Sequence, residues 1–237
     1  MNSTTNDKLA VLIDADNAQA SPVHELLEEV SRYGTASVKR AYGDWSTPQL
    51  KKWKEELHTH AIKPVQQFAY TKGKNSTDSA LIIDAMDLLH TGDLNGFCLV
   101  SSDSDFTPLA ARIREAGLVV YGFGERKTPQ PFVAACDKFI YTDILKPPAT
   151  KTSKAKAKSP SPRKKLREAV DKAAQDDGWA NLGTVGTMLL KNDPSFDSRN
   201  YGFRKLVDLV KAQSYLEIRK ENIGSGSGGA TIFVRLK

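Results

Sequence analysis

The sequence predicts two domains, a three-layer α/β domain followed by a small α+β domain, and three observations support this division. Within residues 1–145, short apolar runs without alternation are separated by helical patterns, which is typical of a parallel sheet covered on both faces. Residues 146–162 contain no large apolar side chain, so they predict a flexible linker. Residues 163–237 return to helical periodicity and end in an alternating strand.

The first domain alternates strands with helices. Short continuous apolar runs predict strands at Leu9–Ile13, Ser37–Ala41, Ile62–Phe68, Phe97–Ser101 and Leu118–Phe123. Amphipathic patterns predict helices near Pro22–Tyr33, Pro48–His60, Asp78–Leu89 and Phe106–Ala116. This order predicts a central parallel sheet between two helical layers.

The second domain is predicted to contain three helices and a hairpin. Two helices are expected at Arg163–Ala174 and Leu182–Leu190, and a third has a buried stripe formed by Phe203, Leu206, Val207 and Val210. The strand Tyr215–Ile218 is expected to reach an alternating strand at 232–236 across the glycine-rich loop 223–229. The order helix-helix-helix-hairpin is that of a winged helix.

Composition excludes several classes of protein. The chain has 237 residues, of which 40% are hydrophobic and 26% charged, so collagen-like, disulfide-scaffold and wholly disordered proteins are excluded. It has no apolar run near the eighteen residues of a membrane span, and its first residues are too polar for a signal peptide. Cys98 and Cys136 lie in apolar surroundings without metal-ligand spacing. We therefore expect a reduced, cytoplasmic protein with no membrane partner.

The net charge of +6 hides a partition along the chain. Residues 1–145 hold 15 basic and 19 acidic residues, whereas residues 146–237 hold 19 basic and 9 acidic ones. Eight of those basic residues lie in 146–165, which has no acid, so residues 166–237 are only +2. This asymmetry favours a polyanionic partner such as nucleic acid, because cationic segments gain from counterion release. A linker kept soluble by lysines is the alternative that charge alone leaves open.

Three segments of the first domain place acids at predicted strand ends or at a helix start. Asp14 and Asp16 directly follow one buried strand, Asp78 opens a helix, and Asp103 and Asp105 follow another strand. In open α/β sheets, ligands bind beyond the carboxyl ends of the strands, where these segments converge. Crowded carboxylates repel one another unless a cation neutralises them, and an oxygen-rich set favours Mg²⁺ or Mn²⁺.

Each acid also has a structural alternative. Asp105 precedes a helix with Pro108 in its first turn and could act as its N-cap, and a helix dipole favours any acid at Asp78. Asp16 or Asn17 could cap the first helix. Capping explains Asp14 and Asp103 less well, because both lie at the ends of buried strands, so we favour a functional acidic site for the set as a whole.

Acids that hold a divalent cation, combined with a basic tail, point to phosphodiester hydrolysis. The sequence has no Gly-x-x-x-x-Gly-Lys-Ser/Thr motif, which argues against a P-loop nucleotide hydrolase. The Asp14-x-Asp16 pair would also suit a haloacid-dehalogenase-like phosphatase, with Asp14 as nucleophile and Asp16 as acid/base. We rank that second, because no obvious cap for a small substrate is present.

The acidic segments read Leu12-Ile-Asp-Ala-Asp-Asn17, Lys74-x-x-x-Asp78-x-x-Leu81-x-x-Asp84-Ala85 and Val100-Ser-Ser-Asp-Ser-Asp-Phe-Thr-Pro-Leu109. Over residues 8–145 the chain thereby resembles the NYN domain family, the PIN-like, LabA-type group of metal-dependent ribonucleases. The resemblance implies a PIN-like fold, with Asn17 and Ser101 lining the site. It also implies a set of acids that are both metal ligands and catalytic residues: Asp14, Asp78, Asp103 and Asp105. Asp84 matches a further acidic position, but six residues of helix separate it from Asp78, so it need not share that face.

The second domain has its own resemblance. The segments Asp177-Gly-Trp-Ala-Asn-Leu-Gly and Asn200-Tyr-Gly-Phe-Arg-Lys-Leu206 are similar to the LOTUS (OST-HTH) domain, a winged helix linked with RNA biology, over residues 163–237. Arg204 and Lys211 are expected to lie opposite the apolar stripe of the third helix, where they could contact phosphates. A winged helix that docks a protein is the alternative, and Trp179 is expected in the core.

These observations together predict a divalent-metal-dependent ribonuclease that cleaves RNA phosphodiester bonds, with the winged helix contributing RNA binding. The expected substrate is single-stranded RNA. Lys72 and Lys74 lie beside Asp78 in sequence and are expected to contact backbone phosphates. A non-cleaving RNA-binding adaptor is the alternative from a different class.

Overall fold

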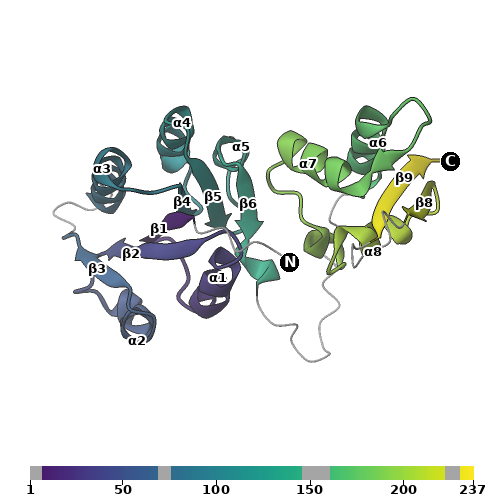
Figure 1. Ribbon diagram of the computed structural model, residues 1–237. Helices are drawn as coiled ribbons and strands as arrows, with labels where there is room; N and C mark the ends of the chain where they lie inside the picture. Colours follow the sequence, from purple (N-terminus) through teal and green to yellow (C-terminus); the bar gives the residue numbers. More distant parts are fainter. Residues whose placement is uncertain (1–6, 69–75, 146–160, 222–229) are drawn as a thin grey trace, which may run out of the picture. The chain divides into compact units, whose positions relative to one another are not determined.

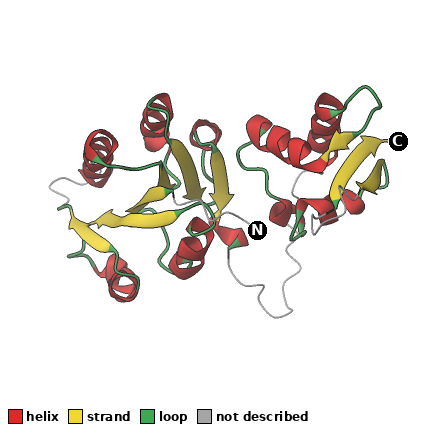
Figure 2. Ribbon diagram, viewed as in Figure 1, coloured by secondary structure: helices red, strands yellow, loops and turns green. Residues whose placement is uncertain are grey.

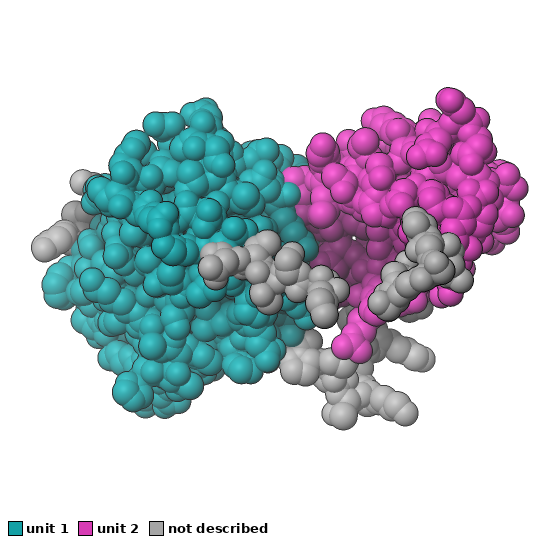
Figure 3. All heavy atoms as spheres, in the orientation of Figure 1, with its two compact units in different colours: residues 1–149 teal, residues 150–237 magenta. Residues whose placement is uncertain are grey.

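The computed structural model describes residues 7–68, 76–145, 161–221 and 230–237. The chain divides into two compact units, residues 1–149 and 150–237, which Figure 3 colours separately. The linker expected at 146–162 falls almost wholly outside the described residues, as does the glycine-rich loop at 223–229. Within the described part of the chain, no helix is long and apolar enough to cross a membrane.

A six-stranded parallel sheet forms the centre of the first unit (Figure 1), in the order β3-β2-β1-β4-β5-β6. β1 lies between β2 and β4, so its apolar residues are covered on all sides. The strands are β1 (Lys8–Asp14), β2 (Thr35–Gly43), β3 (Lys63–Gln66), β4 (Gly96–Val100), β5 (Val119–Gly124) and β6 (Lys138–Tyr141). All five pairings are parallel, so every strand ends at the same edge of the sheet.

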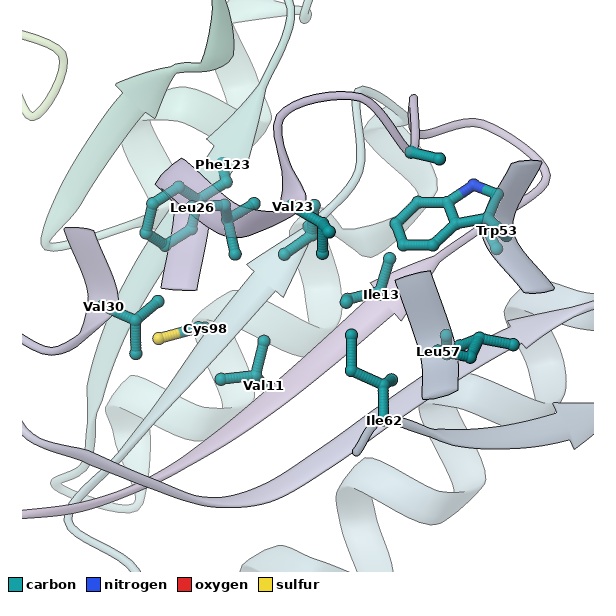
Figure 4. Close-up of a cluster of buried hydrophobic side chains, with 14 of the residues drawn as sticks. Val11, Ile13, Val23, Leu26, Val30, Trp53, Leu57, Ile62, Cys98 and Phe123 are labelled. Atoms are coloured by element: carbon teal, nitrogen blue, oxygen red, sulfur yellow. The ribbon is translucent and has the colours of Figure 1, made fainter. Parts of the chain in front are cut away.

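Helices cover both faces of this sheet and form two separate cores. Val11 and Ile13 of β1 point to the face covered by α1 (Val23–Val30) and α2 (Lys51–Thr59), where Trp53 and Leu57 pack (Figure 4). Leu12 points to the opposite face, because successive side chains of a strand alternate. That face is covered by α3 (Ser76–Thr91), α4 (Thr107–Glu115) and α5 (Gln130–Ala135). The predicted three-layer α/β architecture is confirmed.

Two elements of the first unit were not predicted from the sequence. α5 has six residues and β6 has four, and both follow β5 directly. A helix of six residues shows less than two full turns of periodicity, so its pattern is weak. β6 nevertheless completes the sheet, since its Phe139 and Ile140 are buried against opposite faces.

The second unit is a small helical domain with an antiparallel sheet (Figure 2). Its helices are α6 (Arg163–Ala173), α7 (Leu182–Asn192) and α8 (Leu206–Lys211). Its strands are β7 (Ala180–Asn181), β8 (Leu216–Glu221) and β9 (Thr231–Leu236), in the order β7-β9-β8. The core gathers side chains such as Leu166, Val185, Leu209 and Val234. The predicted winged-helix order is confirmed, with the two-residue β7 as an addition.

The third helix of this unit is shorter than expected. Phe203 does not belong to it, because its backbone N–H bonds to Ser198 O at 3.1 Å and closes the preceding 3-10 turn, Ser198–Tyr201. Gly202 ends that turn in a left-handed conformation, with φ of 85°. α8 therefore begins at Leu206, and its buried residues are Leu209 and Val210. Trp179 is buried, as predicted.

Candidate metal centre

Asp14 is the last residue of β1 and is fully buried between the neighbouring strands. Its Oδ2 accepts hydrogen bonds from Ser101 Oγ at 2.7 Å and from Asn17 Nδ2 at 3.0 Å, and its Oδ1 accepts one from the Asn17 backbone N–H at 3.3 Å. Burial raises the pKa of Asp14 above its usual value, and the bonds from Ser101 and Asn17 oppose this shift. Neutral donors thus hold this buried carboxylate in position.

Three other acids gather at the same edge of the sheet. Asp78 lies in the first turn of α3, and Asp103 and Asp105 lie in the segment that leaves β4. Their carboxylate oxygens all come within 4.8 Å of one another. Asp78 is buried, Asp103 is half-buried and Asp105 is exposed, so the cluster opens to solvent on one side.

Ser101 links this cluster to Asp14. The Asp103 backbone N–H donates to Ser101 Oγ at 3.1 Å, and the Ser101 hydroxyl in turn donates to Asp14. Asp103 also caps the short 3-10 helix Ser104–Phe106, because its Oδ1 accepts from the Asp105 backbone N–H at 2.9 Å. Asp105 does not have the capping role considered for it, because the N-cap residue of α4 is Phe106.

The electrostatics of Asp78 reflect the crowding of acids. Burial, together with the smaller effect of the negative charges on Asp14, Asp103, Asp105 and Asp16, raises the pKa of Asp78 to about 6. Asp14 is thus close enough to act on Asp78 electrostatically, although it is not one of the three acids whose oxygens converge. A carboxylate in such surroundings is stabilised by a cation.

Asp16 connects three loops at this edge. Its Oδ2 accepts a hydrogen bond from Thr77 Oγ1 at 2.7 Å, and its Oδ1 accepts one from the Asp44 backbone N–H at 3.4 Å. Thr77 directly precedes Asp78, so Asp16 fixes the start of α3 relative to β1 and β2. The sequence offered only a capping or phosphatase role for Asp16. The one sequence feature that could have indicated this structural role of Asp16 is Thr77, a hydroxyl residue directly before Asp78 at the start of a helix.

Asp84, the further acidic position of α3, lies away from the cluster. It forms an ion pair with Arg40 and accepts a hydrogen bond from the Tyr42 hydroxyl, both on β2. The hydrogen bond to Asp84 raises the pKa of Arg40, and burial raises that of Tyr42. Asp84 thus ties α3 to the sheet, two turns beyond Asp78.

The remaining predicted site residues divide between the two units. Asn17 and Ser101 lie beside Asp14, as the hydrogen bonds above show. Arg204 and Lys211 are exposed residues of the second unit. Lys211 is the last residue of α8, but Arg204 lies before α8, so the expectation that Arg204 lies on this helix is wrong. Lys72 and Lys74 lie outside the described residues.

The chemistry of this donor set fits a divalent cation. Among the described residues, Asp78, Asp103 and Asp105 form the group of side chains close enough to share one metal ion. Carboxylate oxygens are the ligands that Mg²⁺ and Mn²⁺ prefer. Burial first, and then the charges of the neighbouring acids, disfavour the charged form of Asp78 in the metal-free cluster. The acidic triad is therefore compatible with a divalent metal site.

Comparison with domain families agrees with this geometry. Residues 8–145 match the NYN domain. This chain belongs to the NYN domain family. Residues 157–227 match the OST-HTH/LOTUS domain, so the NYN domain is followed by an OST-HTH/LOTUS domain. Both domains suggest nucleic-acid binding, and the acidic triad of the NYN domain fits a nuclease site.

Several solved structures resemble parts of the chain. A protein of unknown function from Vibrio parahaemolyticus is 20% identical, with a TM-score of 0.49, over 60% of this chain and 96% of that one. An uncharacterised Nitrosomonas europaea protein is 35% identical, with a TM-score of 0.31, over 39% of this chain and 85% of that one. A Chromobacterium violaceum protein is 38% identical, with a TM-score of 0.27, over 34% of this chain and 84% of that one. No curated protein matches the chain. The assignment thus rests on the two domain matches.

Proposed function

We propose that this protein is a divalent-metal-dependent ribonuclease, in which the NYN domain cleaves phosphodiester bonds of single-stranded RNA. The observation that carries this proposal is the convergence of Asp78, Asp103 and Asp105, whose oxygens lie within 4.8 Å of one another at the carboxyl edge of the sheet. Ligands of open α/β sheets bind at this edge. The NYN family match supports the same reaction.

The residues of the centre have distinct tasks in this proposal. Asp78, Asp103 and Asp105 hold Mg²⁺ or Mn²⁺, and Asp14 contributes negative charge beside them. When bound, the cation supplies Lewis-acid stabilisation of the charge that develops at the phosphate. Ser101 and Asn17 keep the Asp14 carboxylate in one orientation, and Asn17 is exposed to an approaching strand. The loop lysines Lys72 and Lys74 are proposed to contact phosphates.

The OST-HTH domain is proposed to contribute RNA binding. Arg204 and Lys211 are exposed there and form no ion pair among the described residues, so their charges are free for phosphates. Arg219 and Arg235 on the hairpin differ, because they pair with Glu221 at 2.9 Å and Glu217 at 2.7 Å. The net charge that this domain offers to RNA is therefore small.

A chelator-controlled cleavage assay tests the proposal. Purified full-length protein is incubated with labelled single-stranded RNA and Mg²⁺ or Mn²⁺, with and without EDTA. We expect cleavage that EDTA stops and that Asp103→Asn abolishes. Asp87→Asn is the matched control, since Asp87 is an exposed acid of α3 outside the cluster. Cleavage that survives both EDTA and Asp103→Asn would overturn the proposal.

The same assay separates the alternatives. RNA that binds tightly to wild type and to Asp103→Asn, with no product in either, would identify a non-cleaving adaptor. Turnover of a small phosphate ester that is lost in Asp14→Asn, with RNA untouched, would identify a phosphatase. Deletion of residues 146–237 then shows which domain supplies RNA affinity.

A further inference from the structure

A groove of about 830 Å³ lies between α2 and β3 of the NYN domain, apart from the acidic cluster. Its floor is apolar and includes Leu57, Ile62 and Pro64. Leu57 and Ile62 rest on the buried core of this face (Figure 4), so the floor is firmly supported. Trp45 lines the groove where β2 has ended, and Lys54 and His58 reach it from one face of α2. It thus combines an aromatic ring, an apolar floor and a basic wall.

Trp45 is fixed in this groove by two hydrogen bonds of its own. Its indole N–H donates to the Val65 carbonyl oxygen at 3.0 Å, and its backbone N–H donates to Gln66 Oε1 at 3.0 Å. Gln66 Nε2 in turn donates to Asp44 Oδ1 at 2.9 Å. The indole is half-buried and packs against the core, yet also lines the groove. A ring held in this way loses little conformational entropy when a flat ligand stacks on it.

The charge around the groove differs from that of the rest of the domain. Residues 1–145 are net acidic, but α2 carries Lys51, Lys52 and Lys54, all of them exposed. Lys63 opens β3 and is also exposed. None of these four lysines forms an ion pair within the described part of the chain. Glu55 and Glu56 lie on the same helix, so the segment from Lys51 to Lys63 has a net charge of +2 (four lysines less two glutamates) within an acidic domain. This local positive charge is complementary to a polyanion.

The Trp45 end of the groove is connected to the loops of the candidate metal centre. Asp14 pairs in register with Tyr42, and Trp45 follows Tyr42 by three residues at the same edge of the sheet. Asp16, which bonds to Thr77 beside Asp78, also accepts the backbone N–H of Asp44, the residue before Trp45. Asp16 thus connects the residue before Asp78 with the residue before Trp45 through hydrogen bonds.

We infer that this groove binds the part of the RNA strand that flanks the scissile phosphate, with one base stacked on Trp45 and a backbone phosphate beside Lys54 and His58. The inference rests on the proposed ribonuclease function and adds where the substrate lies. Aromatic platforms with adjacent cations are how proteins bind single strands without strong sequence preference. Stacking on Trp45 requires an unstacked base, so the groove selects single-stranded over double-stranded RNA.

Photocrosslinking tests the inference without relying on cleavage. Full-length Asp103→Asn protein is irradiated with a single-stranded RNA that carries 5-iodouridine, and the adducts are located by peptide mass spectrometry. We expect an adduct at Trp45. Adducts found at other positions but not in the peptides that line the groove would overturn the inference.

Binding measurements with matched variants give the second readout. Trp45→Leu is expected to raise the Kd for single-stranded RNA about tenfold or more, whereas Trp45→Phe, which keeps a flat ring, recovers most of the affinity. Lys54→Gln is expected to lower the salt dependence of binding by about one phosphate contact. Lys52→Gln is the control, because Lys52 lies on α2 but does not line the groove. Equal effects of the two lysine variants would show that the charge of α2, and not the groove, binds RNA.

Failure of this inference can be told apart from failure of the proposed function. If metal-dependent cleavage is present but Trp45→Leu changes neither Kd nor KM, the groove is not a substrate site and the ribonuclease proposal stands. If no cleavage occurs but the Trp45 adduct forms and Trp45→Leu weakens binding, the groove is an RNA site on a non-cleaving protein. If Trp45→Leu changes the oligomeric state of the free protein, the groove is an interface between two copies of the chain and the inference is wrong.

Discussion

The Ser101 hydroxyl donates a hydrogen bond of 2.7 Å to the buried carboxylate of Asp14. The same oxygen accepts a bond of 3.1 Å from the backbone N–H of Asp103. One small side chain therefore fixes the end of β1 to the segment that carries two acids of the cluster. The geometry of the centre depends on residues that need not touch a metal.

We expect Ser101→Ala to lower the rate of RNA cleavage by about 10–100-fold, because residues that orient metal-site carboxylates have effects of this size. The variant also removes a donor from buried Asp14, so the free energy of unfolding should fall by about 1–3 kcal/mol. Steady-state kinetics and thermal melts measure the two effects. Ser104→Ala is the control, since Ser104 lies outside this hydrogen-bond chain, and equal losses in both variants would contradict the prediction.

The raised pKa of Asp78 makes metal-free stability depend on pH. In the folded state the pKa of Asp78 is about 6, compared with the ordinary aspartate value of 3.8 that applies to the unfolded chain. The folded chain thus binds the proton more tightly than the unfolded chain, and stability is lost as pH rises from about 4 through about 6. The upward shift of Asp14 acts in the same direction.

A divalent cation should reverse this loss, because it competes with the proton for the same carboxylates. We expect Mn²⁺ to raise the melting temperature at about pH 7.5 and to have little effect at about pH 5, where Asp78 is mostly protonated. Thermal melts across pH, with Mn²⁺ or EDTA, provide the measurement. Asp78→Asn should weaken the pH trend, leaving the part due to Asp14, and should abolish the Mn²⁺ effect. Equal stabilisation at both pH values would show that Asp78 is not a ligand.

Asp84 should matter for stability and not for metal binding. Asp84→Asn weakens its contacts with Arg40 and Tyr42 and is expected to lower the free energy of unfolding by about 1–3 kcal/mol. Chemical denaturation measures this loss, and calorimetry should find an unchanged Kd for Mn²⁺. Asp87→Asn on the same helix is expected to leave both unchanged. A large loss of Mn²⁺ affinity in Asp84→Asn would place Asp84 in the centre.

The linker should dominate the salt dependence of RNA binding. Residues 146–165 contribute eight basic residues and no acid, whereas residues 166–237 are only +2. Replacing Lys151, Lys154, Lys156 and Lys158 by glutamine should therefore lower the slope of log K against log salt more than the Arg204→Gln, Lys211→Gln variant does. Binding titrations at several salt concentrations decide this, and the opposite ranking would refute the charge partition.

The position of the acids at one edge of the sheet could be predicted from the sequence, because topology alone decides it. Asp14, Asp78, Asp103 and Asp105 follow strands or open a helix, and a parallel sheet places all such positions at one edge. Their individual arrangement depends on side-chain contacts across more than 60 residues. Thr77 reaches back to Asp16, and Ser101 reaches Asp14, so neither bond has a local pattern.

The missed elements have a similar cause. α5 and β6 are too short for periodicity to indicate them, and they are stabilised by burial of Phe132 and Phe139 against β5 and α4. Phe203 fits the apolar spacing of the third helix, but its backbone N–H bonds to Ser198 in the preceding turn and it lies outside α8. The groove at Trp45 was not predicted, although an aromatic residue just beyond a strand, at the edge that carries the acids, was its signal.

The pairing of β1 with β4 sets the order in which the proposed centre can form. Lys8 and Asn95, at the start of these strands, are joined by hydrogen bonds across 87 residues of sequence. During synthesis, Asp14 therefore leaves the ribosome long before Asp103, and the two acids meet only after β4 has inserted beside β1. Contacts so distant in sequence slow folding, because a long loop must close before they form. Truncated chains that end before β4 lack Asp103 and Asp105, so we expect them to lack the proposed activity.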